Sequence, residues 1–198
     1  MKNKWLEEIT EELKKLPGIG EKSAFKITLH ILSRPQEEVE EFARKLVDIK
    51  RNLKFCSICG GLTVEDPCEI CSDPYRDRSI LMVVEKPQDI FVFEKTGVFK
   101  GKYHVLGGLI SPSAGITPDK LRIKELKERV VKEGVKELII STSPTVEGET
   151  TALYIKKLFE NTPVKISRLA SGIPFGADLE FTDERTLSRA LLNRITLE

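Results

Sequence analysis

The sequence predicts an α/β protein assembled from several modules, and three features of its 198 residues support this prediction. Apolar residues recur at helical spacing up to about residue 54. A segment rich in cysteine, glycine and proline follows, and short apolar runs alternate with helical patterns from Ser79 onward. Strands that alternate with helices in this way are typical of a parallel sheet. We therefore expect a helical domain at 1–54, a cysteine module at 55–76, a parallel-sheet α/β domain at 77–172, and a strand–helix tail at 173–198.

Three helices are expected in the helical domain, at 5–16, 21–33 and 35–53. The stretch "LPGIG" breaks the chain between the first two, and the third has proline and acidic residues in its first turn, where both suit a helix. The first helix carries an apolar stripe that we expect to be buried, formed by Trp5, Ile9, Leu13 and Leu16.

The sheet is expected to contain strands at 79–84, 103–106, 136–141 and 164–170. Helices are expected between and after them at 87–97, 117–134 and 148–160. The tail shows one more strand-like piece and a final helix.

Composition argues against a membrane protein, but it does not indicate a binding partner. Hydrophobic residues make up 40% of the chain, and the longest apolar run, "ILMVV" at 80–84, is far too short to cross a bilayer. The N-terminal stretch is a charged amphipathic pattern without the apolar centre of a signal peptide, so we expect a cytoplasmic protein without a membrane partner. The formal net charge is +1, so a surface that binds nucleic acid would have to be a local basic patch.

All four cysteines of the chain fall in one short segment with the spacing C-x2-C-x8-C-x2-C: Cys56, Cys59, Cys68 and Cys71. Thiolates two residues apart can bind one ion, and two such pairs complete a tetrahedral shell. A pair of disulfides is the alternative, but disulfides are rare in cytosolic proteins. The spacing therefore predicts one structural Zn²⁺ per chain. Four protein ligands leave no open position for catalysis.

The stretch "LPGIGEKSAFKITLHIL" at 16–32 predicts a helix end, a glycine turn and a second helix. Gly18 and Gly20 allow the backbone to approach a phosphate closely, and the next helix N-terminus offers free N–H groups. A basic stripe follows at every fourth residue: Lys22, Lys26, His30 and Arg34. A glycine turn between helices is common and a lysine stripe can simply be solvated. The combination nevertheless resembles the helix-hairpin-helix motif, which grips DNA phosphates without reading bases.

Three glutamates are expected at the carboxyl edge of the sheet. Glu85 follows the first strand, and Glu147 and Glu149 follow the strand at 136–141. The stretch "VVEKPQDI" resembles the first motif of Toprim domains, and "SPTVEGE" resembles the second, whose pattern is Asp-Pro-Asp-x-Glu-Gly-Glu. Ser143 and Thr145 stand in the two aspartate places. Hydroxyls are poor substitutes for the carboxylate ligands of Mg²⁺, so we expect that this site has lost its catalytic metal.

The order of these parts resembles one family over essentially the whole chain. A helix-hairpin-helix, a four-cysteine zinc module, a Toprim (Rossmann-like) parallel-sheet domain without the aspartates, and the tail "LASGIPFGADLEFTDERTLSRAL" are similar to the bacterial recombination mediators of the RecR family. The resemblance implies a non-enzymatic role in DNA repair. Such proteins act with RecO, and in some settings RecF, to load RecA at single-stranded gaps, and they form rings that encircle single- or double-stranded DNA.

The resemblance also assigns roles to residues. Lys22 and Lys26, supported by Gly18, Gly20 and Arg34, are the expected DNA contacts, and the four cysteines are the expected zinc ligands. The acidic cluster of Glu85, Glu147 and Glu149 is expected to bind a partner protein.

Two other functions remain open on the sequence. One is a Mg²⁺-dependent Toprim nuclease in which the glutamates alone hold the metal, and the other is a zinc-stabilised interaction module that does not bind DNA. A single hairpin offers few phosphate contacts, so tight binding requires several copies in one assembly. We expect a dimer or tetramer held by the N-terminal helix and the tail.

Overall fold

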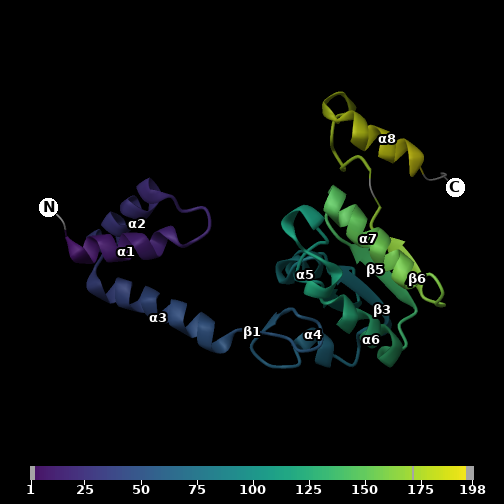
Figure 1. The fold of residues 1–198 in the computed structure, drawn as a ribbon, viewed down its shortest axis with the longest axis horizontal. Helices are drawn as coiled ribbons and strands as arrows, with labels where there is room; N and C mark the ends of the chain where they lie inside the picture. Colours follow the sequence, from purple (N-terminus) through teal and green to yellow (C-terminus); the bar gives the residue numbers. More distant parts are fainter. Residues whose placement is uncertain (1–2, 171, 195–198) are drawn as a thin grey trace. The chain divides into compact units, whose positions relative to one another are not determined.

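The computed structural model describes residues 3–170 and 172–194 and divides into two compact units, 1–53 and 54–198 (Figure 1). The predicted α/β class is confirmed: the first unit is helical, and the second contains a parallel sheet with helices. In the part of the chain that the structure describes, no helix is both long and apolar enough to span a membrane.

The first unit consists of the three expected helices, α1 (Lys4–Lys14), α2 (Glu21–Ser33) and α3 (Gln36–Asn52). Helix α1 begins where the Asn3 side chain accepts a hydrogen bond from the Leu6 N–H, a common way to satisfy the free donors of a first turn. Only Ala24 and Thr28 are buried among the described residues of this unit. The 53-residue unit therefore has almost no hydrophobic core of its own.

The expected buried stripe on α1 is wrong for the isolated chain. Trp5 is 79% exposed, Ile9 is 41% exposed and Leu16 is also exposed, while Leu13 is partly buried. Helical spacing correctly indicated which side of α1 is apolar. A second surface is needed to cover that side, and the described residues of the helical unit do not provide one.

Four parallel strands form the sheet of the second unit, in the order β4-β3-β5-β6. They are β3 (Asp77–Val84), β4 (Gly101–Val105), β5 (Glu137–Ser141) and β6 (Lys165–Arg168). Three helices lie around them (Figure 1): α5 (Pro87–Glu94), α6 (Ile123–Glu133) and α7 (Val146–Leu158).

Both faces of the sheet are covered, as the apolar strand sequences require. Leu81 and Val83 of β3 pack with residues of α6 and α7 on one face. Met82 and Val84 alternate to the other face, where they pack with Ile90 of α5. The cysteine module contributes Ile70 to this second cluster, so it packs on the sheet.

Two expected elements differ from the structure. The helix expected at 117–134 is a 3-10 turn, Pro118–Lys120, followed by α6, because Leu121 is extended and the Arg122 N–H donates to the Leu106 carbonyl. The chain does end with a strand and a helix, β6 and α8 (Glu184–Leu192). No further strand forms among the described tail residues 172–194; the chain instead makes a 3-10 turn, Leu179–Phe181, in which the Asp178 side chain accepts from the Glu180 N–H. Residues 195–198 of the predicted tail lie outside the described residues.

Candidate functional site

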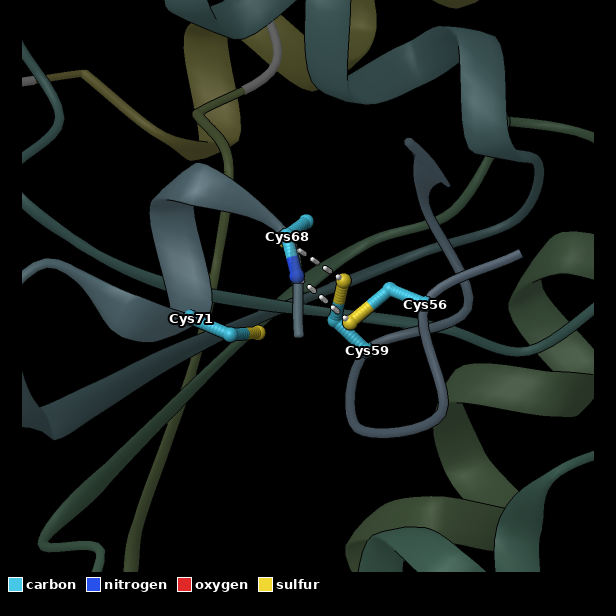
Figure 2. Close-up of side chains that lie close together, drawn as sticks. All are labelled: Cys56, Cys59, Cys68 and Cys71. Carbon is cyan, nitrogen blue, oxygen red and sulfur yellow. Dashed lines mark hydrogen bonds between the residues drawn. The ribbon is translucent and has the colours of Figure 1, made fainter. Parts of the chain in front are cut away.

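The four cysteines meet at one point, as their spacing predicts. Their sulfur atoms all lie within 4.8 Å of one another, and all four side chains are buried. Figure 2 shows the two pairs directed toward a shared space. The first pair comes from the loop between β1 (Lys54–Phe55) and β2 (Leu62–Thr63), and the second from the start of the short helix α4 (Glu69–Ser72).

Backbone donors already face these sulfurs. The Gly61 N–H donates to Cys59 Sγ at 3.3 Å, and the Cys68 N–H donates to Cys56 Sγ at 3.4 Å. Hydrogen bonds among the thiols and burial raise the pKa of Cys59 to about 12 and also raise the pKa of Cys71. Hydrogen bonds from Cys59 and Cys71 instead lower the pKa of Cys68 to about 2. A tetrahedral Zn²⁺ ion bound by four thiolates suits this donor set. The cysteines form a closed, structural zinc site.

The helix-hairpin turn presents an uncapped helix end. Gly18 adopts a left-handed conformation with φ +81°, which a residue with a side chain would adopt only with strain. Gly20 occupies the N-cap of α2, and no side chain caps this end, whereas α1, α7 and α8 each have a side-chain cap. The first N–H groups of α2 are therefore available to an anion such as a phosphate.

The basic stripe lies on the exposed side of α2, but its members are not equivalent. Lys22, Lys26 and His30 are exposed, and within the described residues no carboxylate forms an ion pair with them. Arg34 instead forms an ion pair with Glu38 of α3 at 2.7 Å. Lys22 and Lys26 are therefore the stronger candidates for phosphate contact, and Arg34 is partly neutralised.

At the acidic edge of the sheet, Ser143 replaces a metal ligand with a hydrogen bond. Glu85 follows β3 and is only 8% exposed. The Ser143 hydroxyl donates to Glu85 Oε2 at 2.8 Å, and Lys86 Nζ lies 3.1 Å from Oε1. Thr145, in the second aspartate place, caps α7 by accepting from the Gly148 N–H at 3.1 Å. Both hydroxyls therefore have structural roles.

The carboxylate of Glu149 is also paired with cations. Arg168 of β6 and Arg189 of α8 both form ion pairs with its carboxylate, and these two arginines lower the pKa of Glu149 below its ordinary value. Glu147 is partly exposed, and among the described residues nothing hydrogen-bonds its carboxylate.

The three glutamates consequently do not form a compact metal cage. Over residues 3–170 and 172–194, the cysteine set is the one group of three or more Cys, His or carboxylate side chains whose ligand atoms lie within 4.8 Å of one another. The prediction of a shared edge is confirmed for the elements that bear these residues, β3 and the β5–α7 junction.

Sequence reasoning missed two features of these surfaces. Arg168 and Arg189 are too far from Glu149 along the chain for any local pattern to reveal the pairing. The second feature was detectable: α3 and its end carry apolar residues at alternating spacings of three and four, and all but the first are exposed. They are Val39, Phe42, Leu46, Ile49 and Leu53.

Comparison with known families accounts for nearly the whole chain. Residues 6–50 match the RecR helix-hairpin-helix, 53–73 the RecR four-cysteine zinc finger domain, 79–170 the Toprim domain, and 172–195 the RecR C-terminal segment.

Two curated relatives illustrate how close the match is. The chain is 52% identical to "Recombination protein RecR" of Clostridium perfringens over 97% of this chain and 96% of the relative. It is 50% identical to the protein of that name from Acidothermus cellulolyticus, over 98% and 97% of the two chains. The chain therefore belongs to the RecR family of recombination proteins.

Proposed function

We propose that this protein is a cytoplasmic, non-enzymatic recombination mediator that binds DNA without sequence preference. In this proposal it acts with RecO, and with RecF in some settings, to promote RecA loading at single-stranded gaps. Family membership supports the recombination role. We also propose that the four parts extend over 1–54, 55–76, 77–172 and 173–198.

The observation that carries the DNA-binding proposal is the uncapped N-terminus of α2 beside two lysines that form no ion pair with any described carboxylate. Gly20 leaves the first N–H groups without a side-chain cap, and Lys22 and Lys26 stand one helical turn apart on the exposed side. These groups recognise phosphate by charge and by hydrogen bonds, neither of which depends on the base sequence.

The acidic edge supports a role without catalysis. Two-metal chemistry requires carboxylates that are free to bind Mg²⁺. Here Ser143 and Thr145 replace two of them, Glu85 accepts the Ser143 hydrogen bond, and Glu149 is paired with arginines. We propose that this edge binds a partner protein, with Glu147 as the acidic group most available to it.

Assembly of several chains is supported by the apolar surfaces that remain exposed on the described residues of each unit. In the helical unit these are the apolar side of α1 and the exposed apolar residues of α3 and its end, Phe42, Leu46, Ile49 and Leu53. In the tail, several large apolar side chains are exposed, among them Phe175, Phe181, Leu191 and Leu192. We propose a dimer or tetramer that joins these surfaces into a ring. Joining several hairpins would raise avidity by about 10²–10⁴.

One preparation tested in two assays separates the candidate functions. We expect single- and double-stranded DNA to bind, and we expect no cleavage with Mg²⁺ or Mn²⁺. Cleavage that disappears in Glu85→Gln would instead establish the nuclease. The absence of both binding and cleavage would establish an interaction module.

The hairpin contact can be measured through its salt dependence. Lys22→Ala and Lys26→Ala should each weaken binding equally for all sequences and reduce the slope of log K against log salt concentration by about one. Lys45→Ala is the matched control, because Lys45 is an exposed lysine of the same unit that pairs with Glu41. Unchanged affinity in the Lys22→Ala/Lys26→Ala double variant would place the DNA contact elsewhere.

Light scattering tests the assembly. The native protein should have the mass of a dimer or tetramer, and polar substitutions at Ile9 and Leu13 should reduce both mass and DNA affinity. A monomer that binds DNA tightly would contradict the ring.

A further inference from the structure

A buried lysine donates to the backbone of one zinc ligand, and no carboxylate of the described residues pairs with it. Lys102 of β4 is only 4% exposed, and its Nζ donates to the Cys71 carbonyl at 2.7 Å. Within the described residues, no Asp or Glu lies within ion-pair distance of this ammonium group. Burying an unpaired charge is costly, so a compensating negative charge is expected close by.

The zinc centre supplies that charge. Four thiolates around one Zn²⁺ carry a formal charge of −2, and this charge sits in a buried cluster. The Cys71 carbonyl that accepts from Lys102 belongs to one of the four ligands. A lysine that donates to the backbone of a ligand therefore lies beside a dianionic centre when the metal is bound, and that compensating charge is lost when the metal leaves.

A second cation binds the backbone between the other two cysteines. Arg122 Nη2 donates to the carbonyls of Ser57 and Ile58, at 3.2 Å each, and these are the two residues between Cys56 and Cys59. Its Nη1 atom is buried without a hydrogen-bond partner in the described structure. A side-chain carbon at Gly60 would lie 1.9 Å from this Nη1, so the guanidinium packs directly against the zinc loop.

The backbone of Arg122 is held in place from the sheet. His104 Nε2 lies 2.7 Å from the Arg122 carbonyl, to which it can only donate. The Arg122 N–H donates to the Leu106 carbonyl at 2.9 Å. The zinc loop is also attached to β4, because the Val105 N–H donates to the Cys59 carbonyl at 2.8 Å. The cation is therefore positioned by strand β4 and the residues that follow it.

We propose that Lys102 and Arg122 are the counter-charges of the zinc–tetrathiolate centre. One cation on each cysteine pair gives a formal sum of zero with the −2 centre. This arrangement retains zinc by two routes. It stabilises the metal-bound, ionised thiolates, and it leaves the buried Lys102 and the partly buried Arg122 uncompensated if the metal departs. It also withdraws electron density from the sulfurs, which lowers their reactivity toward electrophiles.

Three substitutions test this proposal against a purely structural role. Lys102→Met and Arg122→Gln remove the charges with little change of volume. Arg129→Met is the matched control, because Arg129 is a buried cation of the same domain that donates to the Tyr103 carbonyl and pairs with Glu133. Circular dichroism first establishes that each zinc-loaded variant is folded.

The readouts are the rate of zinc transfer to an excess of a colorimetric chelator and the rate of thiol alkylation by iodoacetamide in the zinc-loaded protein. Outer-shell substitutions in metal sites typically change metal affinity by about 10–100-fold. We therefore expect about 10-fold faster zinc transfer and faster alkylation in both test variants, with Arg129→Met unchanged in both rates. Arg122→Lys keeps the charge, so its rates of zinc transfer and alkylation should lie close to those of the wild type.

Equal rates in wild type, Lys102→Met and Arg122→Gln would overturn the proposal. So would equal acceleration in Arg129→Met, because that result would show that general destabilisation releases the metal. If Lys102→Met fails to fold with zinc, Arg122→Gln decides the question, since this side chain is only partly buried.

Discussion

The cysteine site and the acidic edge of the sheet lie in the same unit, and both match a known metal-binding motif. They differ in whether their side chains can bind a metal. The four sulfurs converge within 4.8 Å, and all four can bind the same ion. At the acidic edge, a serine, a threonine and two arginines occupy or neutralise the positions that would hold a metal. A motif thus predicts a site when every ligand is present. When some are replaced, the neighbouring side chains decide what the remaining ones do.

The largest expected effect is the loss of zinc. Cys71→Ser, or prolonged chelation, should unfold the cysteine module and expose the β4 edge that it covers, because zinc binding contributes about 10–16 kcal/mol in small zinc-dependent folds. Metal analysis should find one Zn²⁺ per wild-type chain. Ser72→Ala, at a neighbouring exposed position, is the control and should retain the metal. If the metal-free chain unfolds at the same temperature as the zinc-loaded wild type, the cysteine site does not depend on metal and the contrast with the acidic edge is wrong.

Gly148→Ala should be the most damaging single change at the acidic edge. A methyl group at Gly148 would lie 1.9 Å from the Ser143 carbonyl oxygen, so the loop between β5 and α7 would have to move. We expect a loss of about 3 kcal/mol in the free energy of unfolding, measured by urea denaturation. The nearby control Thr150→Ala, at an exposed position of α7, should cost well under about 1 kcal/mol. Similar values for the two variants would contradict this account of the loop.

The substitution Ser143→Asp tests whether the acidic edge of the sheet can bind a metal again. The new carboxylate would face buried Glu85 and replace a donated hydrogen bond with repulsion, which should cost about 2 kcal/mol. We expect Mg²⁺ not to recover this loss, because Glu149 remains paired with Arg168 and Arg189. Ser143→Ala separates the lost hydrogen bond from the added charge. Stabilisation of Ser143→Asp by Mg²⁺ would show that a single aspartate restores the site.

The ion pairs of Glu149 should have the smallest effect, and one that depends on pH. Arg168 and Arg189 lower the pKa of Glu149 from 4.5, so the stability they add is present above that pH and is lost as the pH falls through the lowered value. Partly exposed pairs contribute about 1 kcal/mol or less, so hydrogen exchange in α8 is the suitable measurement. Glu149→Gln should reduce the protection of α8 against exchange at neutral pH, and the variant should not show the further loss of protection that the wild type shows as the pH falls through the lowered pKa of Glu149. Glu147→Gln is the control and should leave α8 unchanged.

Much of the fold was predictable because its signals are local. Helices α2 and α3, the four strands and the cysteine spacing depend on residues close together in the sequence. The start of α6 was placed too early because the hydrogen bond from Arg122 to Leu106 breaks a pattern that otherwise continues. The strand-like piece expected in the tail does not form among the described residues, because a strand needs a neighbouring strand with which to pair and a local sequence pattern does not provide one.

The sequence by itself determined the modules, the zinc ligands and the substitution of both aspartates, since residue type and spacing are sufficient for each. Only the tertiary structure decided how the remaining charges are used. Glu149 meets Arg189 from 40 positions away, and Lys102 meets Cys71 from 31 positions away. Such pairings depend on which side chains the folded sheet brings within a few ångströms, and Coulomb interactions and hydrogen bonds act over that distance regardless of separation along the chain.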